Sequence, residues 1–203
     1  MKKGILGLLL VILILAVILG IKILVPKENK IYTAEELKAK ILSAFDYTNY
    51  TYEYTQDGEK TIKRVRDNII VTENDKNSSW IDGEANTLIS IDKEDKKYAN
   101  IDLNSTTKEF VYKKDFLDMP SLLEIYGDDI YYIDTENYKG KNCLRIQAGE
   151  DKATYLVDEE TGFILKYESG DGGSIAEFDI ELNNVTEEDV KMPDLSGYTR
   201  AGS

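Results

Sequence analysis

The sequence predicts a mainly β domain with two short helices, preceded by one transmembrane helix. Short segments in which apolar and polar residues alternate recur between turn residues, which is typical of antiparallel strands joined by hairpins. Two other segments carry apolar residues at helical spacing, and residues 4–21 hold no charge. We expect a strongly curved half-barrel sheet of about 10–11 antiparallel strands, with the helices on its concave face.

The N-terminal segment is expected to anchor the chain in the cytoplasmic membrane. Gly4–Ile21 is uncharged and, at ~1.5 Å per residue, nearly crosses a ~30 Å hydrocarbon core. A cleaved signal peptide is the alternative, but the apolar run is long and no A-x-A site follows it. We therefore expect residues 1–25 to form an uncleaved signal-anchor. Lys2 and Lys3 place the N-terminus inside, so this single-pass protein exposes its domain outside the cell.

Residues 26–32 are predicted to be a polar linker, and residues 33–200 a single extracytoplasmic domain. From residue 31 onward the chain holds 37 acidic and 20 basic side chains, a net charge of −17. This charge disfavours nucleic acid and anionic headgroups as partners. The single cysteine, Cys143, allows no internal disulfide, so an apolar core must hold the fold together.

The first half of the domain begins with a helix and continues as strands. Thr33-Ala34-Glu35-Glu36 has the pattern of a capping box, and apolar residues recur at helical spacing behind it, so Ala34–Phe45 is predicted to be an amphipathic helix. Asn49–Thr55 then changes to a period of two, with three tyrosines on one face. Further strands are predicted at Lys60–Arg66, Ile69–Glu73, Ser78–Ile81, Thr87–Ile91, Lys97–Leu103 and Lys108–Tyr112.

The second half holds the other helix and the last strands. Asp118–Tyr126, with Pro120 near its start, is predicted to be a short helix. Strands are predicted at Asp129–Thr135, Asn142–Ala148, Ala153–Val157, Phe163–Tyr167 and a segment that ends at Leu182. In that segment Ala176, Phe178, Ile180 and Leu182 share one face, and Glu177, Asp179 and Glu181 the other. Such alternation predicts a sheet that is covered on one side and solvated on the other. Phe163, Leu165 and Tyr167 are likewise predicted to share one face.

The chemistry-bearing residues point away from an enzyme. The chain has no histidine, which excludes Ser-His-Asp and Cys-His arrangements and histidine metal sites. Acidic pairs suited to a glycosidase abound in so acidic a chain and therefore discriminate nothing. None of the acidic clusters has EF-hand spacing. We predict no catalytic residue, no metal site and no cofactor.

Several segments, in this order, resemble the LolA/LolB-like lipoprotein carrier superfamily, which includes RseB-like sensor domains. They are Leu37–Tyr54, Met119–Leu123, Tyr138–Gln147, Leu156–Tyr167 and Leu182–Val185. The resemblance spans nearly all of residues 33–197. It implies a half-barrel whose helices close an apolar cavity for acyl chains. The basic-Pro segment of true carriers is missing and the chain is expected to be tethered, so the resemblance concerns the fold more than a shuttle function.

Three functions follow from these expectations. The first is a membrane-tethered, extracytoplasmic lipid- or lipoprotein-binding domain of the bacterial cell envelope. The second is an RseB-like sensing module that binds an envelope protein and carries no lipid. The third is a cell-wall hydrolase that uses two carboxylates. The expected partners are lipid or lipoprotein acyl chains, the cytoplasmic membrane through residues 4–25 and, in the second case, an envelope protein.

The expected ligand cavity lies between the apolar sheet face and the two helices. Aromatic and aliphatic residues of the predicted strands and of the second helix are its candidate lining, although ordinary sheet core is the alternative for each. They are Tyr50, Tyr52, Tyr54, Trp80, Leu122, Leu123, Leu144, Ile146, Phe163, Leu165, Tyr167, Phe178, Ile180 and Leu182.

Overall fold

The computed structural model of the protein describes residues 30–56, 58–104, 129–150 and 152–201. Contacts divide the chain into two compact units, Met1–Ile31 and Tyr32–Ser203, and the fold described below is that of the second unit. The predicted anchor, the strand at Lys108–Tyr112 and the helix at Asp118–Tyr126 lie outside the described residues. None of the helices in the described ranges has the length and apolar character needed to cross a bilayer.

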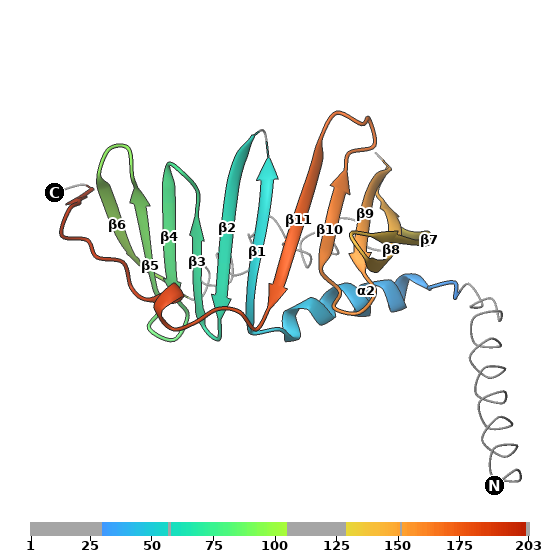
Figure 1. The fold of residues 1–203 in the computed structure, drawn as a ribbon, viewed down its shortest axis with the longest axis horizontal. Helices are drawn as coiled ribbons and strands as arrows, with labels where there is room; N and C mark the ends of the chain where they lie inside the picture. The colour runs from blue at the N-terminus through green and yellow to red at the C-terminus, as the bar shows by residue number, and fades with distance from the viewer. Residues whose placement is uncertain (1–29, 57, 105–128, 151, 202–203) are drawn as a thin grey trace, which may run out of the picture. The chain divides into compact units, whose positions relative to one another are not determined.

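Twelve described strands form one sheet in the order β12-β6-β5-β4-β3-β2-β1-β11-β10-β9-β8-β7 (Figure 1). The strands are β1 (Asn49–Gln56), β2 (Glu59–Arg66), β3 (Ile69–Glu73), β4 (Asn77–Asp82), β5 (Thr87–Asp92), β6 (Lys97–Asp102), β7 (Ile130–Tyr138), β8 (Lys141–Ala148), β9 (Ala153–Asp158), β10 (Ile164–Glu168), β11 (Ile175–Leu182) and β12 (Thr199–Arg200). All neighbours are antiparallel except β12 and β6. The β1–β11 pair joins the two halves of the chain, because residues far apart in the sequence meet there.

The prediction of a mainly β fold with a large, open, curved sheet is confirmed (Figure 1). The described strands number twelve, one or two more than expected, because the C-terminal tail adds β12 beside β6. That strand has only two residues, so it carries no alternation that a pattern could reveal. The tail also forms the short 3-10 helix η2 (Glu188–Val190).

The predicted N-terminal helix is present as α2 (Ala34–Leu42), followed by the 3-10 turn η1 (Ser43–Asp46). Its capping box forms as expected: the Glu36 backbone N–H donates to Thr33 Oγ1 at 3.2 Å, and the Thr33 N–H donates to Glu36 Oε2 at 3.0 Å. The helix buries Leu37 and Ile41, each 1% exposed, against the sheet.

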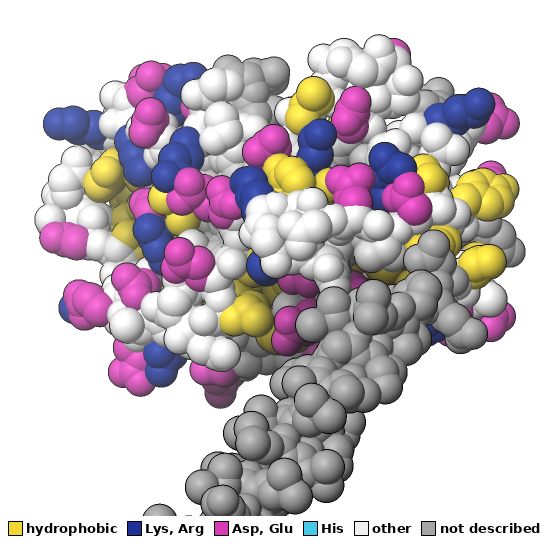
Figure 2. All heavy atoms as spheres, turned by 45° about the vertical axis from the view of Figure 1, so that its right-hand side comes forward, with side chains coloured by type: hydrophobic (Ala, Val, Ile, Leu, Met, Phe, Trp, Pro, Cys, Tyr) yellow, Lys and Arg dark blue, Asp and Glu magenta, His cyan; other side chains and the backbone are white. Residues whose placement is uncertain are grey.

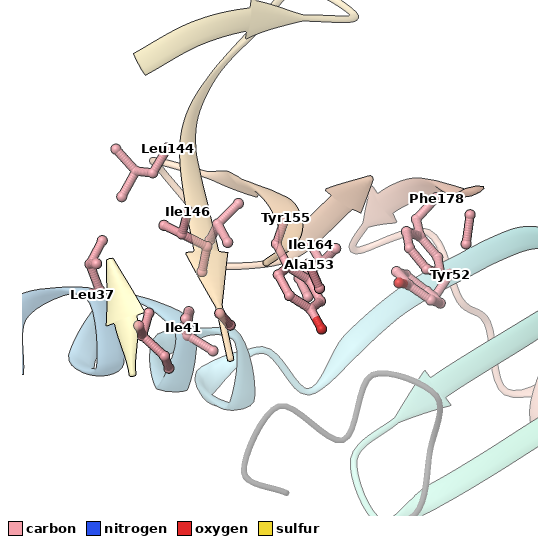
Figure 3. Packing of buried hydrophobic residues seen from close by; sticks show 13 residues of the cluster. Leu37, Ile41, Tyr52, Leu144, Ile146, Ala153, Tyr155, Ile164 and Phe178 are labelled. Atoms are coloured by element: carbon pink, nitrogen blue, oxygen red, sulfur yellow. The ribbon is translucent and has the colours of Figure 1, made fainter. Parts of the chain in front are cut away.

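The sheet face against which α2 packs is called the inner face. Figure 3 shows Leu37 and Ile41 beside Leu144 and Ile146 of β8, with Tyr155, Phe178 and Tyr52 farther along the same face. This α2 cluster contains Leu37, Ile41, Tyr52, Ile130, Leu144, Ile146, Ala148, Ala153, Tyr155, Val157, Ile164, Ala176 and Phe178. It forms the main core of the domain.

On the outer face the C-terminal tail covers part of the other half of the sheet. Trp80 of β4 donates its indole N–H to the carbonyl of Val190 in η2 at 2.8 Å. Trp80 also forms a buried cluster with Ile89 and Ile91, against which Leu195 and Tyr198 of the tail pack. The tail therefore buries apolar side chains of β4 and β5 that would otherwise face solvent.

The prediction that Phe163, Leu165 and Tyr167 share one face is wrong. Ile164 pairs with Val157, but Lys166 pairs with Leu156, so Leu165 is an extra residue in β10 and forms a β-bulge. The bulge reverses the alternation. Leu165 turns to the outer face, where it is buried with Cys143 and Leu156, whereas Tyr167 packs against the inner-face α2 cluster.

Candidate functional site

The structure brings most of the candidate cavity residues together on the inner face. Those in or packed against the α2 cluster are Tyr50, Tyr52, Tyr54, Leu144, Ile146, Tyr167, Phe178 and Ile180. Leu182 pairs with Tyr50, and the Phe163 ring lies 5.0 Å from the Tyr50 ring. Trp80 and Leu165 instead belong to clusters on the outer face. Leu122 and Leu123 lie outside the described residues.

The aromatic side chains of β1 and β11 form the centre of this face. Tyr52 stacks on Phe178 with ring centroids 5.2 Å apart and an angle of 19° between the ring planes. Tyr54 lies 5.9 Å from the same Phe178 ring. Burial raises the pKa of Tyr52 well above its ordinary value and the pKa of Tyr50 to about 12. Both phenols are therefore neutral at physiological pH.

The Tyr52 hydroxyl is a buried polar atom without a hydrogen-bond partner in the described part of the chain. The side chain is only 1% exposed, so bulk water does not replace the missing partner. Such an atom loses its hydration without a compensating bond, which costs about 1–3 kcal/mol.

A continuous apolar row crosses the inner face beyond the α2 cluster. Residues that pair directly across antiparallel strands lie on the same face, and the register aligns one apolar residue from each of seven consecutive strands. The row is Leu182 (β11), Tyr50 (β1), Val65 (β2), Ile70 (β3), Ile81 (β4), Leu88 (β5) and Ile101 (β6). At ~4.8 Å between strands it extends ~29 Å.

The next row of the inner face is polar over the same strands. Tyr52 pairs with Lys63, and the row continues through Thr72, Ser79 and Ser90. Lys63 is only 6% exposed, so a buried cation lies beside the apolar row. The inner face of β2–β5 is therefore amphipathic, whereas that of β9–β11 is apolar over the α2 cluster.

Sequence reasoning missed Val65, Ile70, Ile81, Leu88 and Ile101 as site residues. Each stands in a strand that the alternation did reveal. What the pattern lacks is the register, which decides that these five side chains line up rather than stagger. The helix α2 contributes Leu37 and Ile41 to the α2 cluster, and neither belongs to the described cluster over β2–β4.

The surface of the domain carries many charged side chains. On the face that Figure 2 shows, acidic and basic side chains are interspersed with small hydrophobic patches. Among the described residues, no group of three or more His, Cys, Asp or Glu side chains is arranged to hold a metal ion. Cys143 is fully buried, and burial raises the pKa of its thiol to about 11, so the thiol stays protonated.

No protein-family model and no curated protein matches the sequence significantly. A solved structure from Thermus thermophilus, described as an uncharacterized conserved protein, matches with a TM-score of 0.52 at 10% identity. The match covers 82% of this chain and 98% of that chain, so the likeness is one of the whole fold.

Two further matches have lower scores. MucB matches with a TM-score of 0.44 at 12% identity, over 79% of this chain and 62% of that chain. A putative outer membrane lipoprotein-sorting protein domain from Vibrio parahaemolyticus matches with a TM-score of 0.31 at 10% identity, over 78% and 97%. With TM-scores below 0.5 they do not define the function of this chain.

Proposed function

We propose that this chain is a membrane-tethered, extracytoplasmic domain that binds the acyl chain of a lipid or lipoprotein on the inner face of its sheet. The observation that carries the proposal is the apolar row from Leu182 to Ile101. It continues the apolar surface of the α2 cluster over β2–β6, where Val65, Ile70 and Ile81 are buried in one cluster with Leu103. Leu88 is half-buried and Ile101 is 42% exposed, so the β5–β6 end of the row is the accessible part. The proposal assigns no catalytic activity to the domain.

The shape and polarity of the row suit an extended hydrocarbon chain. The row is unbroken because the register between β1 and β6 has no shift, and its length of ~29 Å accommodates a long acyl chain. Binding would come from removal of apolar surface from water, about 25 cal/mol per Å². The polar row beside it, from Lys63 to Ser90, would provide a polar surface for the lipid head group along one side of the acyl chain.

The test is uptake of a fluorescent fatty-acid probe by the purified full-length protein. We expect saturable binding that changes little between low and high salt, because apolar contact is not screened by ions. Absence of uptake at every salt concentration would reject lipid binding. Strong weakening by salt would show that a charge, and not the apolar row, holds the probe.

Two substitutions locate the binding surface. Leu88→Asn places an amide in the row at a half-buried position, and we expect it to weaken probe binding while the domain stays folded by circular dichroism. Thr87→Asn makes a similar change one residue earlier, on the outer face of β5, and should bind like the wild type. Equal binding by all three proteins would exclude the row as the site.

The second candidate function is a sensing module that binds an envelope protein and carries no lipid. It is favoured by the tight packing of the α2 cluster, in which Tyr52, Leu144, Ile146 and Phe178 are at most 2% exposed. A wild-type protein that never takes up an apolar probe would support this module over the lipid-binding domain.

Membrane tethering through residues 4–25 is part of the proposal. Its support is the uncharged run Gly4–Ile21 and the two lysines before it. Replacement of Leu13 and Leu15 by lysine, at ~2.5–3.5 kcal/mol of insertion cost each, should move the protein from the membrane fraction to the supernatant. A mature N-terminus found after Pro26 would instead identify a cleaved signal peptide.

A further inference from the structure

A pocket of about 500 Å³ lies on the outer face of β7–β10, opposite the α2 cluster. Its floor is Leu156 of β9, which is buried together with Cys143 and Leu165. This pocket takes no part in the proposed lipid binding, because its lining side chains point away from the inner face.

The register places one cation on each side of the apolar floor. Arg145 of β8 pairs with Leu156, and Leu156 pairs with Lys166 of β10, so the three side chains form one cross-strand row. The two cationic residues are two strand spacings apart, ~10 Å at the backbone. Their long side chains can therefore converge on a single group bound above Leu156.

Two β-bulges make the floor and wall of this pocket apolar. Tyr132 pairs with Ile146 and Asp134 pairs with Arg145, so Ile133 is an extra residue in β7. Ile133 is 44% exposed and lines the pocket. The bulge at Leu165 in β10 places a second apolar side chain in the buried cluster that contains Leu156. The side chains of Ile133 and Leu165 reach this pocket region because the bulges interrupt the regular alternation of their strands.

Ion pairs surround the pocket. Arg145 Nη1 lies 3.5 Å from Glu136 Oε2, and Lys166 Nζ lies 3.4 Å from Glu168 Oε2. The lining thus carries two positive and two negative side chains, in a chain whose net charge is −13. Arg145 also bonds Asp134, yet its Nε–H is buried and has no hydrogen-bond partner within the described residues.

We propose that this pocket binds a small zwitterion with an apolar side chain, the class to which the free apolar α-amino acids belong. Its carboxylate lies between Arg145 and Lys166, its ammonium group bonds Glu136 or Glu168, and its side chain rests on Leu156 and Ile133. The volume suits one such molecule. A long acyl chain does not fit, because charged side chains flank the floor and offer it no apolar path.

The experiment compares four probes on the full-length protein by saturation-transfer NMR titration. L-Leucine carries both charges, N-acetyl-L-leucine only the negative one, L-leucinamide only the positive one, and glycine has no side chain. We expect L-leucine to bind about 10-fold or more tightly than each of the other three, since each lacks one of the charge-assisted or apolar contacts. Failure of L-leucine to bind, or equal binding by N-acetyl-L-leucine, would overturn the proposal.

Variants connect the binding to the pocket. Arg145→Gln and Lys166→Gln should each weaken L-leucine binding about 10-fold. The control is Arg64→Gln, which removes a cation that pairs with Glu73 at 2.6 Å on the outer face of β2. Arg64 lines no part of this pocket, so that variant should bind like the wild type. Thermal unfolding of each variant checks its fold, and unchanged binding by a folded Lys166→Gln would also overturn the proposal.

Loss of L-leucine binding and loss of fatty-acid binding are separable results. The pocket and the apolar row lie on opposite faces of the sheet. Leu88→Asn should therefore leave L-leucine binding unchanged, and Lys166→Gln should leave fatty-acid binding unchanged.

Discussion

Gly162 lies directly against the carbonyl oxygen of Lys40. A Cβ atom on Gly162 would come within 2.1 Å of that oxygen and within 2.8 Å of Ser43 Oγ. Gly162 also has φ +80°, a left-handed conformation that side chains disfavour. The hairpin between β9 and β10 therefore packs against the last turn of α2 at a distance that only glycine permits. This contact fixes the helix on the inner face.

We predict that Gly162→Ala lowers the free energy of unfolding by about 3 kcal/mol or more, because strain and a backbone clash combine. The matched control is Gly140→Ala. Gly140 has φ +82° but nothing within 4 Å of an added Cβ, so it should lose only about 1 kcal/mol. Urea unfolding of both variants measures the difference. Equal losses would mean that α2 does not approach the hairpin this closely.

The two faces of β11 should respond differently to truncation. Phe178 is 2% exposed and stacks on Tyr52, so Phe178→Ala should destabilise the domain by about 3–5 kcal/mol. Glu177 lies next to it on the outer face, 3.5 Å from Lys139, with both side chains largely solvated. Glu177→Ala should change stability by no more than about 0.5 kcal/mol. Similar losses in urea unfolding would contradict the register of β11.

The unpartnered hydroxyl of Tyr52 leads to a prediction of opposite sign. Tyr52→Phe should leave stability unchanged or raise it by about 1 kcal/mol, because it removes a buried donor that makes no bond in the described structure. Tyr32→Phe makes the same chemical change where the hydroxyl donates to Glu159 at 2.7 Å, and should cost about 1 kcal/mol. A clear loss at Tyr52 in thermal unfolding would show that its hydroxyl is bonded.

Asp158 should make stability depend on acid pH. Burial would raise the pKa of this carboxyl, but hydrogen bonds from Lys141, the Glu160 N–H and Thr161 outweigh it and lower the pKa below 3.8. The charged form therefore stabilises the fold above the unfolded-state pKa, and this stabilisation is lost as the pH falls through the folded-state pKa.

Asp158→Asn should accordingly be less stable than the wild type at pH 7, and the difference should shrink as the pH falls below about 4. Urea unfolding at a series of pH values measures it. The exposed Asp179, which bonds Lys139 at 2.8 Å, provides the control, and Asp179→Asn should follow the wild-type profile. A difference for Asp158→Asn that stays constant down to about pH 2 would show that its charge does not contribute.

The type and approximate place of α2 and of β1–β11 could be predicted from the sequence. The capping box at Thr33 and the alternation of strands such as β3 and β11 are local properties, which propensity and periodicity express within a few residues. The burial of Cys143 could also be predicted, since a cysteine inside a strand of a domain without disulfides is most often a small core residue.

Which side chains meet could not be predicted from the sequence, because it depends on how the strands pair. The bulges at Ile133 and Leu165 reverse the alternation, and a period of two cannot show where an extra residue enters a ladder. Trp80 lies on the outer face because the register puts its neighbour Ile81 on the inner face. The hydrogen-bond partner of Trp80 comes from the tail, where the Val190 carbonyl lies 110 residues away in the sequence. The apolar row and the outer pocket likewise depend on register between strands. Register is set by pairing across the sheet, so no single segment of the sequence encodes it. A shift of one residue would send each of these side chains to the opposite face.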